Sequence, residues 1–98
     1  MATTKKKLDK ALQEQKRVIF TTIGWEDYNS WCSDSKKIER VNKLIDAAKK
    51  SPLDGIGKAE RLSGDLKGYY SRRIDREHRL LYTYVNSDLW IMSARFHY

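Results

Sequence analysis

The segment Arg95-Phe96-His97-Tyr98 carries side chains that are well suited to chemistry. An imidazole accepts or donates a proton near neutral pH, and a phenol hydroxyl both donates and accepts hydrogen bonds. The segment follows Leu89-Trp90-Ile91-Met92-Ser93-Ala94, an apolar run that predicts a β-strand. Two interpretations are open at this point. Either His97 and Tyr98 form a catalytic tail, or Phe96 and Tyr98 complete the core while His97 points outward.

Arginines along the predicted strands gather on one face of the sheet, because alternate residues of a strand share a face. A three-residue hairpin loop at residues 86–88 would place Val85 opposite Leu89, Leu81 opposite Ser93 and Arg79 opposite Arg95. The other face would then turn toward the helices with Trp90, Met92, Ala94 and Phe96. Two arginines that face each other repel, so the pattern favours an anion between them.

If the hairpin loop before residue 79 has an odd number of residues, Arg73 lies on the same face as Arg79 and Arg95. If the number is even, Arg73 lies on the other face. The forked donors of arginine suit phosphate better than lysine does. The sequence therefore predicts a phosphate-binding face on the sheet, with His97 on the same side.

Lys58 and Glu60 follow a loop that contains Gly55 and Gly57. Glu60 is either a salt-bridge partner of the arginines or, together with His97, half of an acid–base pair. RNA cleavage by its own 2′-hydroxyl needs a base, a cation for the charge at phosphorus and an acid for the leaving 5′-oxygen. This chemistry requires neither a metal nor a cofactor, and we expect none.

Secondary-structure patterns predict the elements that position these residues. Strands are expected over 17–20, 60–62, 69–74, 78–85 and 89–96, and turn residues separate them. Thr21 or Thr22 can cap a first helix, whose apolar stripe contains Trp25, Tyr28, and Trp31 or Cys32. A second helix has the apolar face Ile38, Val41, Leu44, Ile45 and Ala48, and ends before Ser51-Pro52. We predict an α+β fold in which a two-helix antiparallel hairpin packs on one face of an antiparallel β-meander.

Composition limits the classes of protein to consider. The 98 residues make one domain, and 20 Lys and Arg against 13 Asp and Glu give a net charge of +7. Residues 1–16 form a basic extension, expected to be flexible or marginally helical, and 17–98 form the domain. The positive charge suggests nucleic acid, an acidic protein or an anionic membrane surface as the partner.

A single cysteine excludes an internal disulfide, and we expect the thiol of Cys32 to be buried. No apolar run reaches transmembrane length, and the first residues lack a secretion signal. We therefore predict a soluble cytoplasmic protein with no membrane partner.

From Arg17 onward the chain resembles the YoeB toxins of the RelE/ParE superfamily. The resemblance rests on Ser71-Arg72-Arg73-Ile74, Glu77-His78-Arg79-Leu80, Arg95-Phe96-His97-Tyr98, Trp25-Glu26-Asp27-Tyr28, and Gly55-Ile56-Gly57-Lys58 leading into Glu60. The chain departs from the family pattern at Arg61, where proline is usual, and at Ser63, where a lysine is found.

The resemblance implies a RelE-like fold and the toxin half of a type II toxin–antitoxin system. Such toxins cleave mRNA in the A site of the 30S ribosomal subunit, form homodimers and are neutralised by a YefM-like antitoxin. By position, Glu60 would be the general base and His97 the general acid, while Arg79 would stabilise the transition state and Tyr98 would position the substrate. Lys58 and Arg73 would hold the RNA backbone, and Arg95 lies on the RNA-binding face predicted above.

Two other classes of function stay open on the sequence alone. A ParE-like inhibitor would act on DNA gyrase by protein contact and would not use the acid, base and arginines. A plain RNA-binding module could stack bases on exposed aromatics such as Tyr69. The small charge of the folded domain argues against strong RNA binding without the ribosome.

Overall fold

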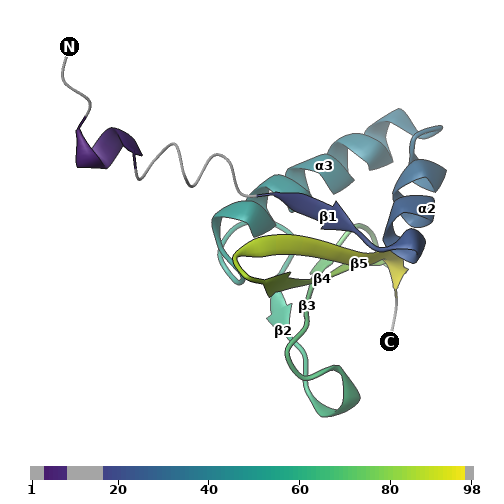
Figure 1. The fold of residues 1–98 in the computed structure, drawn as a ribbon. Helices are drawn as coiled ribbons and strands as arrows, with labels where there is room; N and C mark the ends of the chain where they lie inside the picture. Colours follow the sequence, from purple (N-terminus) through teal and green to yellow (C-terminus); the bar gives the residue numbers. More distant parts are fainter. Residues whose placement is uncertain (1–3, 9–16, 97–98) are drawn as a thin grey trace.

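The structure is a computed structural model that describes residues 4–8 and 17–96. Residues 5–8 form one helical turn, which begins where the Thr4 hydroxyl accepts a hydrogen bond from the Lys7 amide at 3.2 Å. The other residues of the basic extension, and His97 and Tyr98, lie outside the described residues. The elements of the domain (Figure 1) are β1 (Val18–Phe20), α2 (Thr22–Trp31), α3 (Ser35–Lys50), β2 (Glu60–Arg61), the short 3-10 helix η1 (Gly64–Leu66), β3 (Tyr70–Arg73), β4 (Arg79–Val85) and β5 (Asp88–Phe96).

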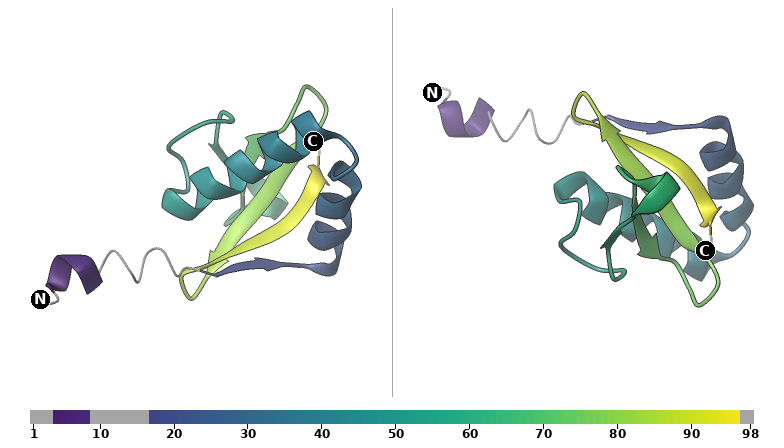
Figure 2. Two further views of the ribbon diagram at one scale, coloured as in Figure 1. Left: turned by 90° about the horizontal axis from the view of Figure 1, so that it is seen from above. Right: turned by 90° about the horizontal axis from the view of Figure 1, so that it is seen from below.

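The strands form one sheet in the order β1-β5-β4-β3-β2. β1 runs parallel to β5, and the other neighbours are antiparallel. Figure 2 shows α3 in front of the sheet from one side and η1 in front of it from the other. The predicted α+β architecture, with a helical hairpin on one face of a β-meander, is confirmed.

A side chain caps the start of each helix, and for α2 the cap is Thr21, one of the two predicted residues. The Thr21 hydroxyl accepts a hydrogen bond from the Gly24 amide at 2.9 Å, and the Asp34 carboxylate accepts one from the Lys37 amide at 3.1 Å. Each cap satisfies an amide that has no partner within the helix. α3 ends at Lys50, directly before Ser51-Pro52, because proline disfavours helical backbone in the residue before it.

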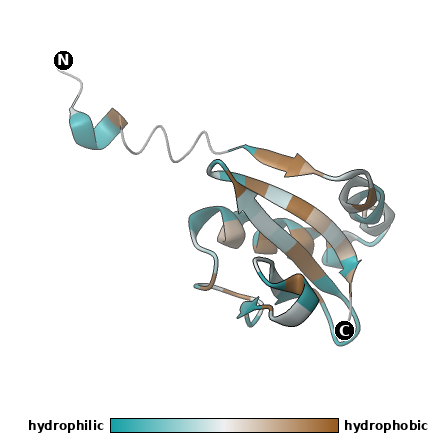
Figure 3. Cartoon of the chain, turned by 60° about the horizontal axis from the view of Figure 1, so that its bottom comes forward, coloured by the Kyte–Doolittle hydropathy of each residue, from teal (hydrophilic) through white to brown (hydrophobic). Residues whose placement is uncertain are grey.

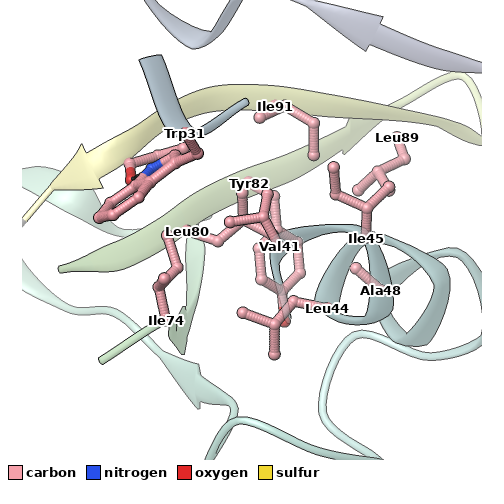
Figure 4. Packing of buried hydrophobic residues seen from close by; sticks show 11 residues of the cluster. Trp31, Val41, Leu44, Ile45, Ala48, Ile74, Leu80, Tyr82, Leu89 and Ile91 are labelled. Atoms are coloured by element: carbon pink, nitrogen blue, oxygen red, sulfur yellow. Dashed lines mark hydrogen bonds between the residues drawn. The ribbon is translucent and has the colours of Figure 1, made fainter. Parts of the chain in front are cut away.

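The core lies between α3 and the sheet (Figure 4). The predicted apolar face of α3 is buried through Val41, Leu44, Ile45 and Ala48. These side chains pack with a set from the strands, the β3–β4 turn and α2: Leu80, Tyr82, Leu89, Ile91, Ala94, Ile74 and Trp31. Figure 3 shows apolar and polar residues mixed along the two long strands, as expected when only one sheet face is covered by helices.

The predicted three-residue loop between β4 and β5 is wrong. Val85 pairs with Asp88, which leaves a two-residue turn of Asn86 and Ser87 with φ of 51° and 71°. Such left-handed pairs close tight hairpins because their twist matches that of the strands. Register shifts then follow, so that Leu81 does face Ser93 as predicted, whereas Arg79 faces Phe96 rather than Arg95.

The same shifts correct the predicted faces of β5. Leu89 and Ile91 are buried against the helices, where Trp90 and Met92 were expected, and after the irregularity Ala94 is buried as predicted. An extra residue in one strand moves all following side chains to the other face. A simple alternation of faces cannot predict this reversal.

Two residues of the α2 stripe also differ from the prediction. Trp31 is buried, but Trp25 is 52% exposed. Cys32, whose thiol was expected to be buried, is exposed as well. α2 approaches β5 through Gly24 and Trp31, which turns Trp25 outward. There its ring stacks on Tyr28 with centroids 6.0 Å apart and meets Phe20 edge-on at 5.4 Å.

No helix within residues 4–8 and 17–96 is long and apolar enough to cross a membrane.

Candidate active site

The candidate active site lies where β2, β3 and β4 adjoin, on the sheet face opposite the helices. Glu60 is the register partner of Ser71, and Ser71 is the register partner of Leu81. Arg79, two residues before Leu81 on β4, is the register partner of Arg73. Pairing of Arg73 with Arg79 was predicted for an odd loop and is confirmed. Strand pairing thus brings residues 60, 73 and 79 together from three adjacent strands.

Glu60 and Arg79 form an ion pair. Glu60 Oε2 lies 3.7 Å from Arg79 Nη1, and the same nitrogen donates a hydrogen bond to the Ser71 hydroxyl at 3.3 Å. The Arg79 side chain is only 13% exposed, whereas that of Glu60 is 48% exposed. The guanidinium is therefore held by its surroundings, while the carboxylate remains within reach of a ligand.

An open cleft of about 350 Å³ begins at Glu60. Its lining comes from β2 and η1 and consists of Glu60, Arg61, Leu62, Ser63, Asp65 and Leu66. The cleft therefore continues from the ion pair along the surface beside η1.

Lys58 is exposed and comes two residues before Glu60, with a left-handed φ of 48°. Just before it, the Gly57 carbonyl accepts a hydrogen bond from the Arg73 amide at 2.7 Å. This hydrogen bond fixes the end of the loop to β3, the strand that also carries Ser71.

Arg95 does not join this cluster, which corrects the predicted three-arginine face. Its Nε donates a hydrogen bond to the Ser30 hydroxyl at 2.7 Å, and its guanidinium carbon lies 3.9 Å from the centroid of the Trp31 ring. The register shift in β5 is the physical reason, because it turns Arg95 toward α2. A guanidinium over an aromatic face is stabilised there by the ring quadrupole.

His97 and Tyr98 lie outside the described residues, so their predicted places stay predictions. The last described residue before them is Phe96, which is the register partner of Arg79.

Arg72 is a residue whose importance the sequence interpretation missed. It is fully buried, and its Nε donates a hydrogen bond to the Tyr82 hydroxyl at 2.9 Å. Burial raises the pKa of the Tyr82 phenol, and the charge of Arg72 partly offsets that rise. The available signal was strand alternation, since Arg72 lies between Ser71 and Arg73 and must point to the helix side.

Asp75 organises the turn from β3 to β4. Partial burial alone would raise the pKa of its carboxyl, but hydrogen bonds from the amides of His78 and Glu77, and from the side chains of Lys37 and His78, outweigh burial and hold the pKa well below its usual range. This turn sets where β4 begins and hence where Arg79 stands.

Among the residues that the structure describes, no three His, Cys, Asp or Glu side chains are grouped as metal ligands. What the site does bring together is a carboxylate, a fixed guanidinium and a neighbouring arginine. Such a set can accept a proton and neutralise a developing negative charge.

Comparison with known proteins shows the family to which the chain belongs. A family described as the YoeB-like toxin of bacterial type II toxin–antitoxin systems matches residues 20–98. Toxin YoeB of Streptomyces coelicolor is 51% identical over 83 residues, which cover 84% of this chain and 99% of that relative.

Solved structures of similar proteins have the same fold. A YoeB/ParE toxin from Agrobacterium tumefaciens matches with a TM-score of 0.79 and 42% identity, covering 84% of this chain and 99% of that one. A YoeB dimer and a YoeB–YefM complex from Staphylococcus aureus match with TM-scores of 0.77 and 0.75, each at 38% identity and covering 86% of this chain and 99% of the other. The chain described here therefore belongs to the YoeB-like toxins of bacterial type II toxin–antitoxin systems.

Proposed function

We propose that this toxin is a ribosome-dependent mRNA endoribonuclease, which cleaves the codon in the A site of the 30S subunit and so inhibits translation. The observation that carries the proposal is the Glu60–Arg79 pair, 3.7 Å apart and open to solvent on the carboxylate side. Arg73, the register partner of Arg79, adds a second guanidinium beside this pair, and adjacent arginines favour an anion such as phosphate between them.

In the proposed reaction Glu60 takes the proton of the 2′-hydroxyl, and the 2′-oxygen attacks the adjacent phosphorus. Arg79 neutralises the charge that develops on the phosphate oxygens. As the bond from phosphorus to the 5′-oxygen breaks, His97 gives a proton to the leaving oxygen. The products are a 2′,3′-cyclic phosphate and a 5′-hydroxyl, and no metal or cofactor takes part.

The other groups bind rather than react. Tyr98 positions the phosphate, and Lys58 and Arg73 hold the RNA backbone. Arg95 has no role in this proposal, because Ser30 and Trp31 already engage its guanidinium.

The partners follow from the relatives that have been solved as a dimer and with YefM. We infer that this toxin acts in the cytoplasm, forms a homodimer and is neutralised by a YefM-like antitoxin. Ile23 and Trp25, which are 62% and 52% exposed, offer apolar surface for such a contact.

Primer-extension mapping on translating ribosomes tests the activity. The wild type should produce cuts confined to A-site codons, and His97→Ala or Glu60→Gln should lower the cleavage rate at least about 100-fold while keeping the circular dichroism spectrum. Lys36→Gln, which removes a positive charge at an exposed position of α3 outside the site, is the matched control and should cleave within about 3-fold of the wild type.

Other outcomes would point to the competing functions. Full cleavage by both site variants would overturn the assignment of acid and base. Inhibition of DNA gyrase without any mRNA cuts would favour the ParE-like inhibitor, and tight binding to free RNA without cleavage would favour an RNA-binding module.

A further inference from the structure

Arg72 is buried completely, yet the hydrogen-bond partners of its guanidinium are backbone carbonyls and one phenol rather than a carboxylate. Nη2 donates to the carbonyls of Ser51 and Asp54, both at 2.8 Å, and Nη1 donates to that of Ile56 at 2.7 Å. Nε donates to the Tyr82 hydroxyl at 2.9 Å. A buried charge is tolerated only when its donors are satisfied, so these four bonds fix the guanidinium and its partners together.

The three carbonyls all belong to the segment of residues 51–57, which joins α3 to Lys58 and has no helix or strand of its own. A further hydrogen bond holds the same segment, because the Tyr82 hydroxyl donates to the Pro52 carbonyl at 2.6 Å. Arg72 and Tyr82 are neighbours across the helix side of β3 and β4. The path of the segment is therefore set by the sheet.

The end of the segment is also packed onto Arg72. A Cβ on Gly57 would lie 3.0 Å from the Cβ of Arg72 and would collide with a methyl group of Leu44, and the φ of 93° at this position disfavours other residues. Three residues later Glu60 enters β2 opposite Ser71. Arg72 thus holds the loop from the helix side, while Ser71 and Arg73 face the ion pair on the other side of the same strand.

We propose that Arg72 is a positioning residue for RNA cleavage, which acts through the 51–57 segment to hold Glu60 in place beside Arg79. The inference rests on the proposed function but adds a residue that does not touch RNA, since its side chain has no exposed surface. A displacement of a reacting group by roughly 1 Å can cost about 100-fold in rate, so a modest change in the loop would be measurable.

A double-mutant cycle of Arg72→Lys with Glu60→Gln tests the inference. Lysine keeps the charge, but its single nitrogen cannot span three carbonyls that the guanidinium reaches from two nitrogens. Arg72→Lys should lower the single-turnover cleavage rate at saturating ribosomes by roughly 10- to 100-fold and change ribosome affinity by less than about 3-fold. In the Glu60→Gln background the same change should alter the rate by less than about 3-fold, because the two residues act as one unit.

Val41→Ala is the control for loss of stability, since Val41 is fully buried on α3 and is not a hydrogen-bond partner of the loop. It should leave the saturating rate within about 3-fold in both backgrounds, at temperatures where it is folded. If Arg72→Lys lowers the rate equally in both backgrounds, Arg72 does not act through Glu60 and the inference is wrong. If Arg72→Lys fails to fold, Tyr82→Phe removes the clamp on the Pro52 carbonyl and should show the same dependence on Glu60.

Amide hydrogen exchange separates this inference from the proposed function. Arg72→Lys should speed exchange at residues 53–58 at least about 10-fold while the core amides of α3 and β4 keep their protection. Unchanged exchange in that segment would overturn the inference whatever the chemistry. Faster exchange in a protein whose wild type cuts no mRNA would instead mean that the loop clamp exists and the proposed activity does not.

Discussion

Charged side chains of the central strands are held in different ways on the two faces of the sheet. On the open face, Arg79 lies beside a half-exposed carboxylate at 3.7 Å. On the helix face, Arg72 is buried and bonded to backbone carbonyls. Because the Glu60 carboxylate is half-exposed and 3.7 Å from Arg79, their pairing contributes little free energy to folding, and little is lost when a phosphate replaces Glu60 as the partner of Arg79. Arg79 can therefore change its partner when a ligand binds, as a binding residue must. Arg72, with its fixed bonds to the backbone, instead holds the neighbouring loop in place.

The sequence predicted residue types better than residue contacts. Glu60 and Arg79 could be proposed as partners because an acid–base reaction on phosphate needs both kinds of group. The role of Arg72 could not be predicted, since its partners are main-chain oxygens, which any residue supplies. The position of Arg95 could not be predicted either, because it depends on an irregularity in β5.

Asp75 permits a prediction about stability at the residue scale. Its Oδ1 accepts hydrogen bonds from the amides of Glu77 and His78, and its Oδ2 lies 3.1 Å from the Lys37 ammonium. Asp75→Asn keeps an oxygen for the amides but turns an NH₂ toward Lys37. We expect the free energy of unfolding in urea at pH 7 to fall by about 1–2 kcal/mol.

The same variant should show a reduced pH dependence. The pKa of Asp75 is lower in the folded than in the unfolded chain, so its ionised form adds stability above about pH 4 and loses that contribution as the pH falls further. The difference between wild type and Asp75→Asn should therefore shrink between pH 5 and about pH 3. Asp46→Asn, an exposed change on α3, serves as control, and an equal pH dependence in both variants would contradict the assignment.

At the scale of the elements, α2 covers part of one edge of β5. β1 pairs with Leu89, Trp90 and Ile91, and within residues 4–8 and 17–96 the rest of this edge of β5 has no strand neighbour. α2 covers it: the Thr21 hydroxyl donates to the Met92 carbonyl at 2.8 Å, and Asp27 accepts from the Ala94 amide at 3.0 Å. These bonds satisfy backbone groups where the strand register shifts.

Gly24→Ala tests this docking of α2. An added Cβ would collide with the Ile91 carbonyl oxygen, which belongs to the backbone and cannot move aside. We expect a loss of about 1–3 kcal/mol, although alanine favours helix over glycine by up to about 1 kcal/mol. Thermal and urea unfolding would measure it.

Glu26→Ala, at an exposed position of the same helix, is the matched control and should change stability by less than about 0.5 kcal/mol. A stabilised Gly24→Ala variant would mean that helix propensity outweighs the contact with β5.

Predictability also differs between elements. The buried face of α3 followed from the sequence because a regular period over 16 residues has one consistent solution. The β4–β5 register did not, because one residue more or less in the turn at Asn86 and Ser87 changes every pairing that follows.

For the whole molecule, the sheet order separates two surfaces. β1 forms one edge of the sheet, where Phe20 belongs to an aromatic cluster with Tyr28 and the exposed Trp25. β2, which carries Glu60, forms the other edge. A protein that covers the aromatic cluster would therefore leave the ion pair on β2 and β4 accessible.

Net charge gives a last prediction at this scale. Residues 1–16 carry five basic and two acidic side chains, or +3 of the total +7, although the family match begins only at residue 20. Long-range attraction to ribosomal RNA depends on net charge and is screened by salt over roughly 10 Å at 0.1 M. The extension should thus affect encounter with the ribosome rather than the cleavage step.

A variant that lacks residues 1–16 should keep the wild-type unfolding temperature and the cleavage rate at saturating ribosomes. At low salt, the ribosome concentration for half-maximal cleavage should rise about 3- to 10-fold, and this difference should vanish as salt increases. Replacing the five basic residues of the extension by glutamine in the full-length chain should reproduce the shift, since charge rather than length is the cause. A loss of cleavage at saturating ribosomes in the shortened protein would instead assign the extension a part in the site itself.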